Sequence, residues 1–265
     1  MIQRSLSEPP ARLYKYRDTS KSTEAIFEER KVFFAPPSAF NDPFDCGFHV
    51  LVTGAKNEAL TEALAWTEVK EKLPDLAPHE QIEAAKEVAS KLIATRREEL
   101  EGIIIAKLSR ETNERAGICC FTEVNDDILM WSHYANCHRG VCLEFSSANG
   151  PFREAQAVEY GGEYPSLDLV AIVTREGLRA TAPWMLRKAD HWLYEKEWRV
   201  LDFETGPGAK AFPPSCLTGI ILGCRIPADE EARVREWIHE WPTEVHVHRA
   251  RQSRTSFRLE IVQES

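Results

Sequence analysis

The chain has 265 residues, of which 43% are hydrophobic and 28% are charged, and its formal net charge at pH 7 is -9. This length suits one large domain with a buried core. The acidic balance argues against broad binding to nucleic acid or anionic membranes, so nucleic acid is expected only through a local basic patch. No apolar run approaches the roughly 20 residues that span a bilayer, and we expect no membrane partner.

The cysteines and the first residues of the chain predict the compartment. The seven cysteines are odd in number and have no repeated spacing, and the first residues lack the apolar stretch of a secretory signal. We therefore expect a cytoplasmic protein whose cysteines are reduced and act as small hydrophobic side chains.

The first elements in chain order are a strand, a short helix and a second strand. Side-chain alternation predicts a strand at residues 12–17, with Leu13 facing away from Tyr16. A helix follows at residues 22–27, and residues 31–35 form the next strand, which two prolines end.

The segment AFNDPFDCGF, residues 39–48, predicts an ordered turn. Asn41 and Asp42 can bond to their own backbone, and Pro43 fixes its φ angle. The phenylalanines around these polar residues predict that the turn is held among buried aromatic side chains.

Residues 56–115 predict a helical insertion or lid, because Ala, Glu, Lys and Leu dominate them. We expect one helix at residues 57–72, a break at Pro74 and Pro78, and a second helix at residues 79–113. An apolar stripe at helical spacing is expected to be core. It consists of Ile82, Ala85, Val88, Ala89, Leu92 and Ile93.

The rest of the chain predicts mainly strands, which do not alternate regularly with helices. We therefore expect an α+β fold, a single domain over residues 1–265 with a mixed, mostly antiparallel sheet and the helical insertion. The expected strands are residues 117–122, 139–146, 155–160, 191–203, 218–222, 244–248 and 257–262. The expected helices are residues 127–135, capped by Asn125 or Asp126, 167–178 and 228–241.

The helix around LMWSHYA raises a functional question. Helical spacing places Met130, His133 and Tyr134 on one side, with Trp131 beside them. Such a histidine could offer a ring nitrogen to a ligand or titrate near neutrality. The alternative is a core histidine bonded to a backbone carbonyl.

A metal site at this helix has little support. His133, Cys137 and His138 have the spacing of metal ligands, but no CxxC pair supplies further ligands. We predict no metal.

The segment WLYEKEWRVL, residues 192–201, is the second candidate site. Strand alternation would place Glu195, Glu197 and Arg199 on one face. Paired carboxylates beside a guanidinium can stabilise the positive charge that develops on a sugar ring during glycosidic cleavage. The alternative is a solvent-facing strand with surface ion pairs.

Two weaker signals remain. Asn41, Asp42 and Asp45 could bind a ribose hydroxyl or a metal, or they could only hold the turn. The arginines of RARQSRTSFR, residues 249–258, would suit a phosphate, or they could belong to a solvated hairpin loop. The chain has no GxGxxG motif, no P-loop and no GxSxG motif, so Rossmann, P-loop and α/β-hydrolase readings have no support.

Several of these motifs together resemble the bacterial family called domain of unknown function 2971. The resemblance covers residues 12–225, with residues 56–115 as its variable part, and it implies relatives rather than a reaction. It rests on YKYR (14–17), FNDPFD (40–45), CFT (120–122), MWSHYA (130–135), HRGVCLEF (138–145), Lys188 and WLYEKEWR (192–199).

The order of the polar motifs is also similar to that of ADP-ribosyltransferase-like folds. These folds carry an Arg, His or Tyr on an early strand, a Tyr or His in the middle and a Glu, often Glu-x-Glu, on a late strand. The resemblance implies that Arg17, beside Tyr16, binds the pyrophosphate of NAD. Tyr134 or Trp131 would stack on nicotinamide. Glu197 would hold the ribose and stabilise its cation, and Glu195 would orient or deprotonate the acceptor. The chain lacks the Ser-Thr-Ser strand of these folds.

We therefore expect an enzyme that cleaves the nicotinamide–ribose bond of NAD or acts on a related nucleotide. One alternative is a metal-dependent nuclease or phosphodiesterase that places magnesium among Asp42, Asp45, Glu144, Glu195 or Glu197. Another is a non-catalytic binding protein in phage defence or toxin control. The candidate catalytic residues are Glu197, Glu195 and His133. The candidate ligand-binding residues are Tyr16, Arg17, Asn41, Asp42, Asp45, Trp131, Tyr134 and Arg199.

Overall fold

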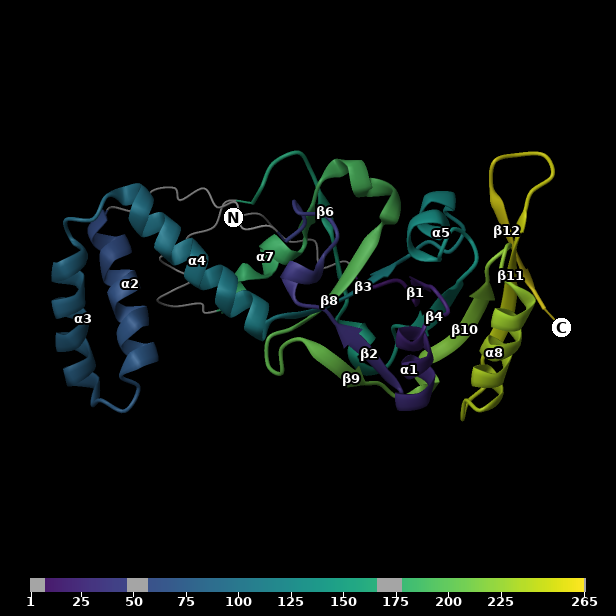
Figure 1. Cartoon of the computed structure of the whole chain (residues 1–265), viewed down its shortest axis with the longest axis horizontal. Helices are drawn as coiled ribbons and strands as arrows, with labels where there is room; N and C mark the ends of the chain where they lie inside the picture. The colour runs from purple at the N-terminus through teal and green to yellow at the C-terminus, as the bar shows by residue number, and fades with distance from the viewer. Residues whose placement is uncertain (1–7, 47–56, 166–177, 265) are drawn as a thin grey trace.

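A computed structural model describes residues 8–46, 57–165 and 178–264 (Figure 1). Its main sheet has eight strands: β1 (Arg12–Arg17), β3 (Gly117–Thr122), β4 (Val141–Ser146), β5 (Gln156–Ala157), β8 (Glu197–Asp202), β10 (Leu217–Leu222), β11 (His246–Gln252) and β12 (Leu259–Gln263). Their order is β12-β11-β10-β4-β1-β3-β8-β5. Among the described strands of this sheet, only β10 and β11 pair in parallel, so the expected α+β fold with a mixed, mostly antiparallel sheet is confirmed.

Two small sheets accompany the main one. They pair β2 (Lys31–Phe34) with β9 (Gly208–Ala211), and β6 (Glu159–Tyr160) with β7 (Arg187–Lys188). The described α-helices are α1 (Lys21–Glu29), α2 (Asn57–Lys72), α3 (Pro78–Leu92), α4 (Arg97–Arg115), α5 (Ile128–Tyr134), α7 (Ala182–Met185) and α8 (Ala228–His239). None of these helices combines the length and the apolar composition needed to cross a membrane.

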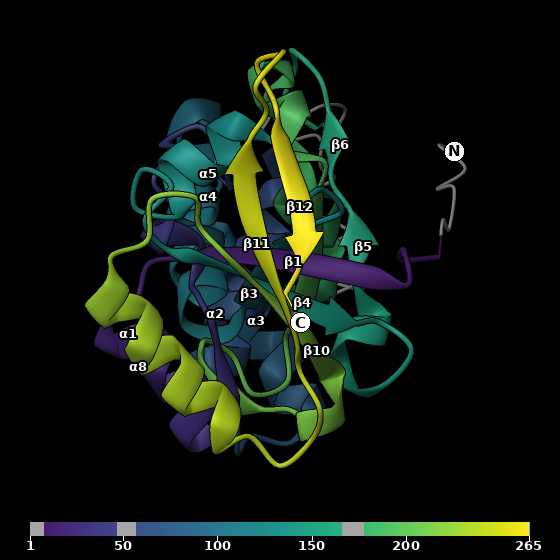
Figure 2. The same ribbon diagram turned by 90° about the vertical axis from the view of Figure 1, so that its right-hand side faces the viewer.

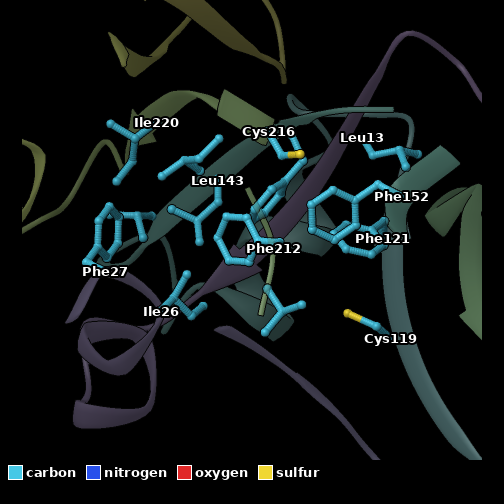
Figure 3. Packing of buried hydrophobic residues seen from close by; sticks show 14 of the residues in the cluster. Leu13, Ile26, Phe27, Cys119, Phe121, Leu143, Phe152, Phe212, Cys216 and Ile220 are labelled. Carbon is cyan, nitrogen blue, oxygen red and sulfur yellow. The ribbon is translucent and has the colours of Figure 1, made fainter. Parts of the chain in front are cut away.

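The larger core lies on one face of the main sheet. It contains Leu13 of β1, and α1 and α8 cover it, with Phe27 stacked on Trp237 at a centroid distance of 5.4 Å (Figure 2). A group of phenylalanines fills its centre, where Phe121 and Phe152 contact edge to face at a centroid distance of 5.1 Å (Figure 3). Burial of aromatic rings of this size is a main stabilising contribution to such a core.

The opposite face carries a second core cluster beneath α5. Tyr14 and Tyr16 of β1 belong to it, together with Met130 and Trp131 of α5. Because successive side chains of a strand point to opposite faces, β1 contributes to both cores. The prediction that Leu13 points to the opposite face of β1 from the two tyrosines is confirmed.

The helical character predicted for residues 56–115 is confirmed, but its second helix is divided. It ends at Leu92 and a new helix starts at Arg97, so α3 and α4 replace the single helix expected at residues 79–113. The change of direction lets Leu100 and Ile104 of α4 pack in one cluster with Leu60 of α2. In Figure 1, α2 and α3 lie at the end of the molecule farthest from β12.

The expected burial of the apolar stripe on α3 is wrong. No residue of α3 is buried, and Ile82 and Ile93 are 46% and 66% exposed. An open groove of about 680 Å³ between α2 and α3 is lined by four residues of the stripe, Ile82, Ala85, Ala89 and Ile93. Leu92 is partly buried against the neighbouring hydrophobic cluster. The hydrophobic cluster of this region forms instead between α2 and α4.

The structure corrects the start of α5 and the turn before residue 47. The N-cap is Asp127 rather than Asn125 or Asp126, because its carboxylate accepts the backbone N–H groups of Leu129 and Met130 at 2.8 and 3.0 Å. The expected turn is present, with the Asp42 carboxylate accepting the N–H of Phe44 at 2.9 Å. The expected burial of its aromatic side chains is wrong for Phe44, which is 64% exposed, whereas Phe40 is partly buried against a hydrophobic cluster. Phe48 lies outside the described residues.

Several expected strands also differ from those observed. Residues 190–195 form a 3-10 helix, η5, and Lys196 has a left-handed φ of 43°, so the strand expected from residue 191 begins only at Glu197. Residues 155–160 divide into β5 and β6, and β11 runs four residues beyond the expected end at residue 248. The helix expected at residues 167–178 lies, up to residue 177, outside the described residues.

Candidate active site in a split of the sheet

The main sheet opens between β1 and β3. β1 pairs with β4 along its whole length, whereas its register with β3 consists of one pair, Tyr14 and Thr122. Beyond this pair a pocket of about 200 Å³ lies between the two strands. The Lys15 ammonium reaches across and donates to the Cys120 carbonyl at 2.8 Å, which satisfies an acceptor that a sheet partner would otherwise bind.

A wider hollow of about 640 Å³ adjoins this pocket. We call the two together the split-sheet cleft, because six residues line both of them. The shared residues are Lys15, Arg17, Phe40, Asn41, Cys120 and Tyr134. α1 and β2 contribute to the lining of the wider hollow, where Lys31 pairs with Glu29 at 2.9 Å.

A cluster of buried charges closes the inner end of the cleft. Glu195, Glu197 and Lys188 line the pocket there. The Lys188 ammonium lies 2.5 Å from an oxygen of Glu195 and 3.0 Å from one of Glu197, and it is 3.4 Å from Asp45. One lysine therefore holds three carboxylates together.

Arg199 supports this cluster from beneath. Its side chain is fully buried and forms a bidentate pair with Asp45, at 2.9 and 2.7 Å. It also donates to both oxygens of Glu197, at 2.7 and 2.9 Å, and to the Met185 carbonyl at 2.6 Å. Such planar, charge-assisted contacts fix carboxylate positions and satisfy charges that are removed from water.

The two glutamates have different pKa shifts. For Glu197, burial acts to raise the pKa, but the charge and hydrogen bonds of Arg199, with Lys188, lower it to about 2. For Glu195, burial outweighs the lowering effects of Lys188 and Tyr134, so its pKa is raised above 4.5. Paired carboxylates with diverging pKa values are a common arrangement for an acid–base group beside a fixed anion.

Tyr134 and His133 line the cleft from the end of α5. The Tyr134 hydroxyl donates to Glu195 at 2.6 Å, and burial followed by this bond raises the pKa of the phenol. His133 is exposed, and its ring lies edge-on to Tyr134 at 6.2 Å. The interpretation of His133 as a core histidine bonded to a carbonyl therefore does not fit its exposed position.

The comparison with known protein families matches this same segment. Residues 130–200 match the family model of DUF2971, described as a protein of unknown function. The chain carries a DUF2971 segment. The family expected from the sequence motifs is thereby confirmed over this segment, which is shorter than the resemblance expected at residues 12–225. The segment runs from α5 into β8, and it contains His133, Tyr134, Lys188, Glu195, Glu197 and Arg199. No curated protein and no solved structure matches the chain.

The fold gathers most of the predicted site residues, inside and outside the DUF2971 segment, around one cleft. Its lining includes Tyr16, Arg17, Asn41, His133, Tyr134, Glu195 and Glu197. Arg17 lies at the β1 end, where its guanidinium donates to the hydroxyls of Ser22 and Thr23 at 2.6 and 3.1 Å. Three motifs that are far apart in sequence thus meet in space.

The other predicted residues lie behind the cleft. Trp131 is fully buried against Tyr16, at a centroid distance of 5.2 Å, and its indole N–H donates to the Asn125 carbonyl, so it packs in the core and does not line the cleft. Asp45 and Arg199 belong to the buried charge cluster. Asp42 accepts the indole N–H of Trp192 at 2.7 Å and holds the turn.

Sequence reasoning gave no role to Lys188 or Lys15. The sequence could have indicated a role for Lys15, because strand alternation places it on the same face as the core residue Leu13. A charged side chain is rarely found on a core face without a partner. Lys188 belongs to the motifs of the family resemblance, but no local pattern links it to its partners. Asp45 is far from it in sequence, and the 3-10 helix η5 lies between Lys188 and the partner Glu197.

Among the described residues, no group of three or more His, Cys, Asp or Glu side chains is arranged to hold a metal ion. The carboxylates that approach one another, Asp45, Glu195 and Glu197, do so around the cationic groups of Lys188 and Arg199. Glu144 instead bonds to the Thr218 hydroxyl at 2.9 Å.

A strained turn joins α5 to β4 and fixes its position. Asn136, Cys137 and His138 have φ angles of 47°, 54° and 67°, which non-glycine residues rarely adopt in succession. Gly140 follows, and a Cβ atom there would lie 2.1 Å from the Arg17 carbonyl oxygen. The backbones of the turn and of β1 therefore touch beside the cleft.

We expect Gly140→Ala to destabilise the protein by about 1–3 kcal/mol, because backbone cannot move as easily as a side chain can. The matched control is Gly102→Ala in the exposed part of α4, where nothing lies within 4 Å of the added methyl group. That change is expected to stabilise by roughly 0.5–1 kcal/mol. Urea unfolding of both variants measures the difference, and equal effects would contradict the close contact at Gly140.

Proposed function

We propose that the split-sheet cleft binds NAD or a related nucleotide and cleaves the bond between nicotinamide and ribose. The observation that carries the proposal is the distribution of charge along one cleft. Lys15, Arg17 and Lys31 line the wider hollow, where Lys31 pairs with Glu29 at 2.9 Å. Glu195 and Glu197 line only the smaller pocket. A dinucleotide has the complementary pattern, since its pyrophosphate is anionic and its reacting ribose becomes cationic.

The chemistry assigned to each glutamate follows from its surroundings. When the C–N bond breaks, its electron pair goes to the nicotinamide nitrogen, which becomes neutral, and the ribose carbon becomes cationic. Glu197 is held ionised by Arg199, so it offers a fixed negative charge to that carbon. Water or an acceptor hydroxyl then attacks the carbon, and its proton passes to Glu195, whose pKa is raised.

Tyr134 is the aromatic side chain suited to the nicotinamide ring. It lines both parts of the cleft, and its hydroxyl is fixed by Glu195 at 2.6 Å. Trp131, the alternative partner for stacking, is sealed beneath Tyr16.

The geometry favours this function over both alternatives. A magnesium-dependent nuclease needs several carboxylates that converge on the ion, whereas no group of three or more His, Cys, Asp or Glu side chains among the described residues is arranged in this way. A purely structural role for the aromatic motifs would leave His133 in the core, whereas it faces the cleft.

Incubation with NAD tests the proposal, with nicotinamide release and calorimetric binding as separate readouts. We expect the wild-type protein to bind NAD and release nicotinamide. Arg17→Glu is expected to weaken binding by about tenfold or more, because it places a negative charge beside the pyrophosphate. Arg153→Glu, an exposed change outside the cleft, is the control. A folded wild-type protein that neither binds nor cleaves NAD would refute the proposal.

A further inference from the structure

The hairpin of β11 and β12 is the most basic part of an acidic chain. Residues 246–259 contain four arginines and two histidines but no acidic residue, although the whole chain has a formal net charge of -9. The hairpin loop extends clear of the other elements at the end of the molecule opposite α3 (Figure 1). Positive charge concentrated on a projecting element attracts a polyanion despite an unfavourable net charge.

Three of the four arginines are available at the surface of this hairpin. Arg249 is engaged, since its guanidinium bonds to Glu231 at 2.6 Å and to Glu264 at 2.5 Å. Arg251, Arg254 and Arg258 are exposed, and the contact of Arg258 with Glu260 is a long one of 3.6 Å. Of the four arginines that the sequence suggested for binding a phosphate, these three remain as candidates.

The loop between the strands is held in a defined shape and presents an aromatic ring. The Ser253 N–H donates to the Arg258 carbonyl at 3.1 Å, and the Arg258 N–H donates to the Ser256 carbonyl at 2.9 Å. Phe257 in the loop is fully exposed, whereas Leu259, which pairs with Gln252 where the loop joins the strands, and Ala250 are buried in the core beneath α5. A large ring held fully in water on an anchored loop is suited to contact with a partner.

We propose that this hairpin binds single-stranded nucleic acid. Arginine forks match phosphate oxygens, and an exposed ring offers a platform on which an unpaired base can stack. Anionic membranes suit the loop less well, because Phe257 stands among Ser253, Thr255 and Ser256 rather than among further apolar residues. The inference does not depend on the chemistry of the cleft.

Fluorescence anisotropy with labelled 12-nucleotide single strands of RNA and DNA tests the proposal on the full chain. Three phosphate contacts predict a log–log salt slope of roughly -2 for single strands. The triple change Arg251→Glu, Arg254→Glu and Arg258→Glu is expected to weaken binding by at least tenfold, and Phe257→Ala by about fivefold or more. The RNA and DNA arms distinguish the two possible sources of the ligand.

A charge-matched control separates the hairpin from net charge. Lys91→Glu, Arg96→Glu and Arg153→Glu alter three exposed cations elsewhere by the same total charge, and they are expected to weaken binding by less than threefold. The proposal is overturned if wild type does not bind single strands, if both triple variants lose equal affinity, or if duplex, polyglutamate or anionic vesicles bind more tightly than single strands.

Discussion

Replacement of Arg199 by methionine is expected to lower the free energy of unfolding by about 3–5 kcal/mol, one of the largest effects of any single change in this chain. The side chain is fully buried and forms charge-assisted bonds with Asp45 and Glu197. Its removal leaves three buried carboxylates, Asp45, Glu195 and Glu197, with only Lys188 to balance them. Urea denaturation at pH 7 measures the loss.

The pH dependence of this loss gives a second check. The pKa of Glu197 is lowered to about 2 in the folded protein, below its ordinary 4.5. Its ionisation therefore stabilises wild type above pH 4.5, and this stability is lost as the pH falls toward 2. The gap between wild type and Arg199→Met should shrink over the same interval.

An exposed ion pair is the control. Arg179 and Glu204 lie 2.9 Å apart, with side chains 68% and 78% exposed, and Arg179→Met is expected to cost less than about 1 kcal/mol. A loss at Arg199 as small as that would show that the buried cluster contributes nothing beyond a surface pair.

Glu195→Gln is expected to reduce nicotinamide release by about 10²–10⁴-fold, because the amide cannot accept a proton from the attacking group. Tyr134 and Lys188 both contact the Glu195 carboxylate, so thermal unfolding should be measured alongside to confirm that the variant is folded. The control is Glu154→Gln, which changes an exposed residue that does not line the cleft and should retain wild-type activity.

The pH–rate profile adds a readout that a structural role would not move. Burial raises the pKa of Glu195 above 4.5, so its ionised form is lost as the pH falls through that raised value. The wild-type rate should decline there, and the residual rate of Glu195→Gln should not. A variant that keeps the wild-type rate within threefold would remove Glu195 from the proposed chemistry.

Local patterns in the sequence predicted the elements well where one face is buried. Leu13 and Tyr16 were assigned to opposite faces of β1 because period-two alternation is a local property. The same argument placed Glu197 and Arg199 together, which the structure confirms. It failed at Glu195, where a 3-10 helix and the left-handed Lys196 interrupt a pattern that still alternates.

Long-range features could not be predicted in this way. The opening between β1 and β3 depends on how strands about 105 residues apart approach each other, and no local pattern encodes it. Lys188 reaches Glu195 and Glu197 only because β7 and η5 fold back on β8. The apolar stripe on α3 shows a second limit of sequence patterns. Helical spacing reveals an apolar face, but it does not tell whether another element packs on that face.

The single pair between Tyr14 and Thr122 has a mechanical consequence. A ladder of many hydrogen bonds resists rotation of one strand against the next. With one pair, we expect β1 and β3 to rotate more easily against each other. Next to that pair, Phe121 of β3 rests on Phe145 of β4 and on Phe152, at centroid distances of 5.6 and 5.1 Å. We expect the bulk of these rings to set the width of the opening, so that a smaller side chain at Phe145 or Phe152, which do not line the cleft, would change the distance between β1 and β3.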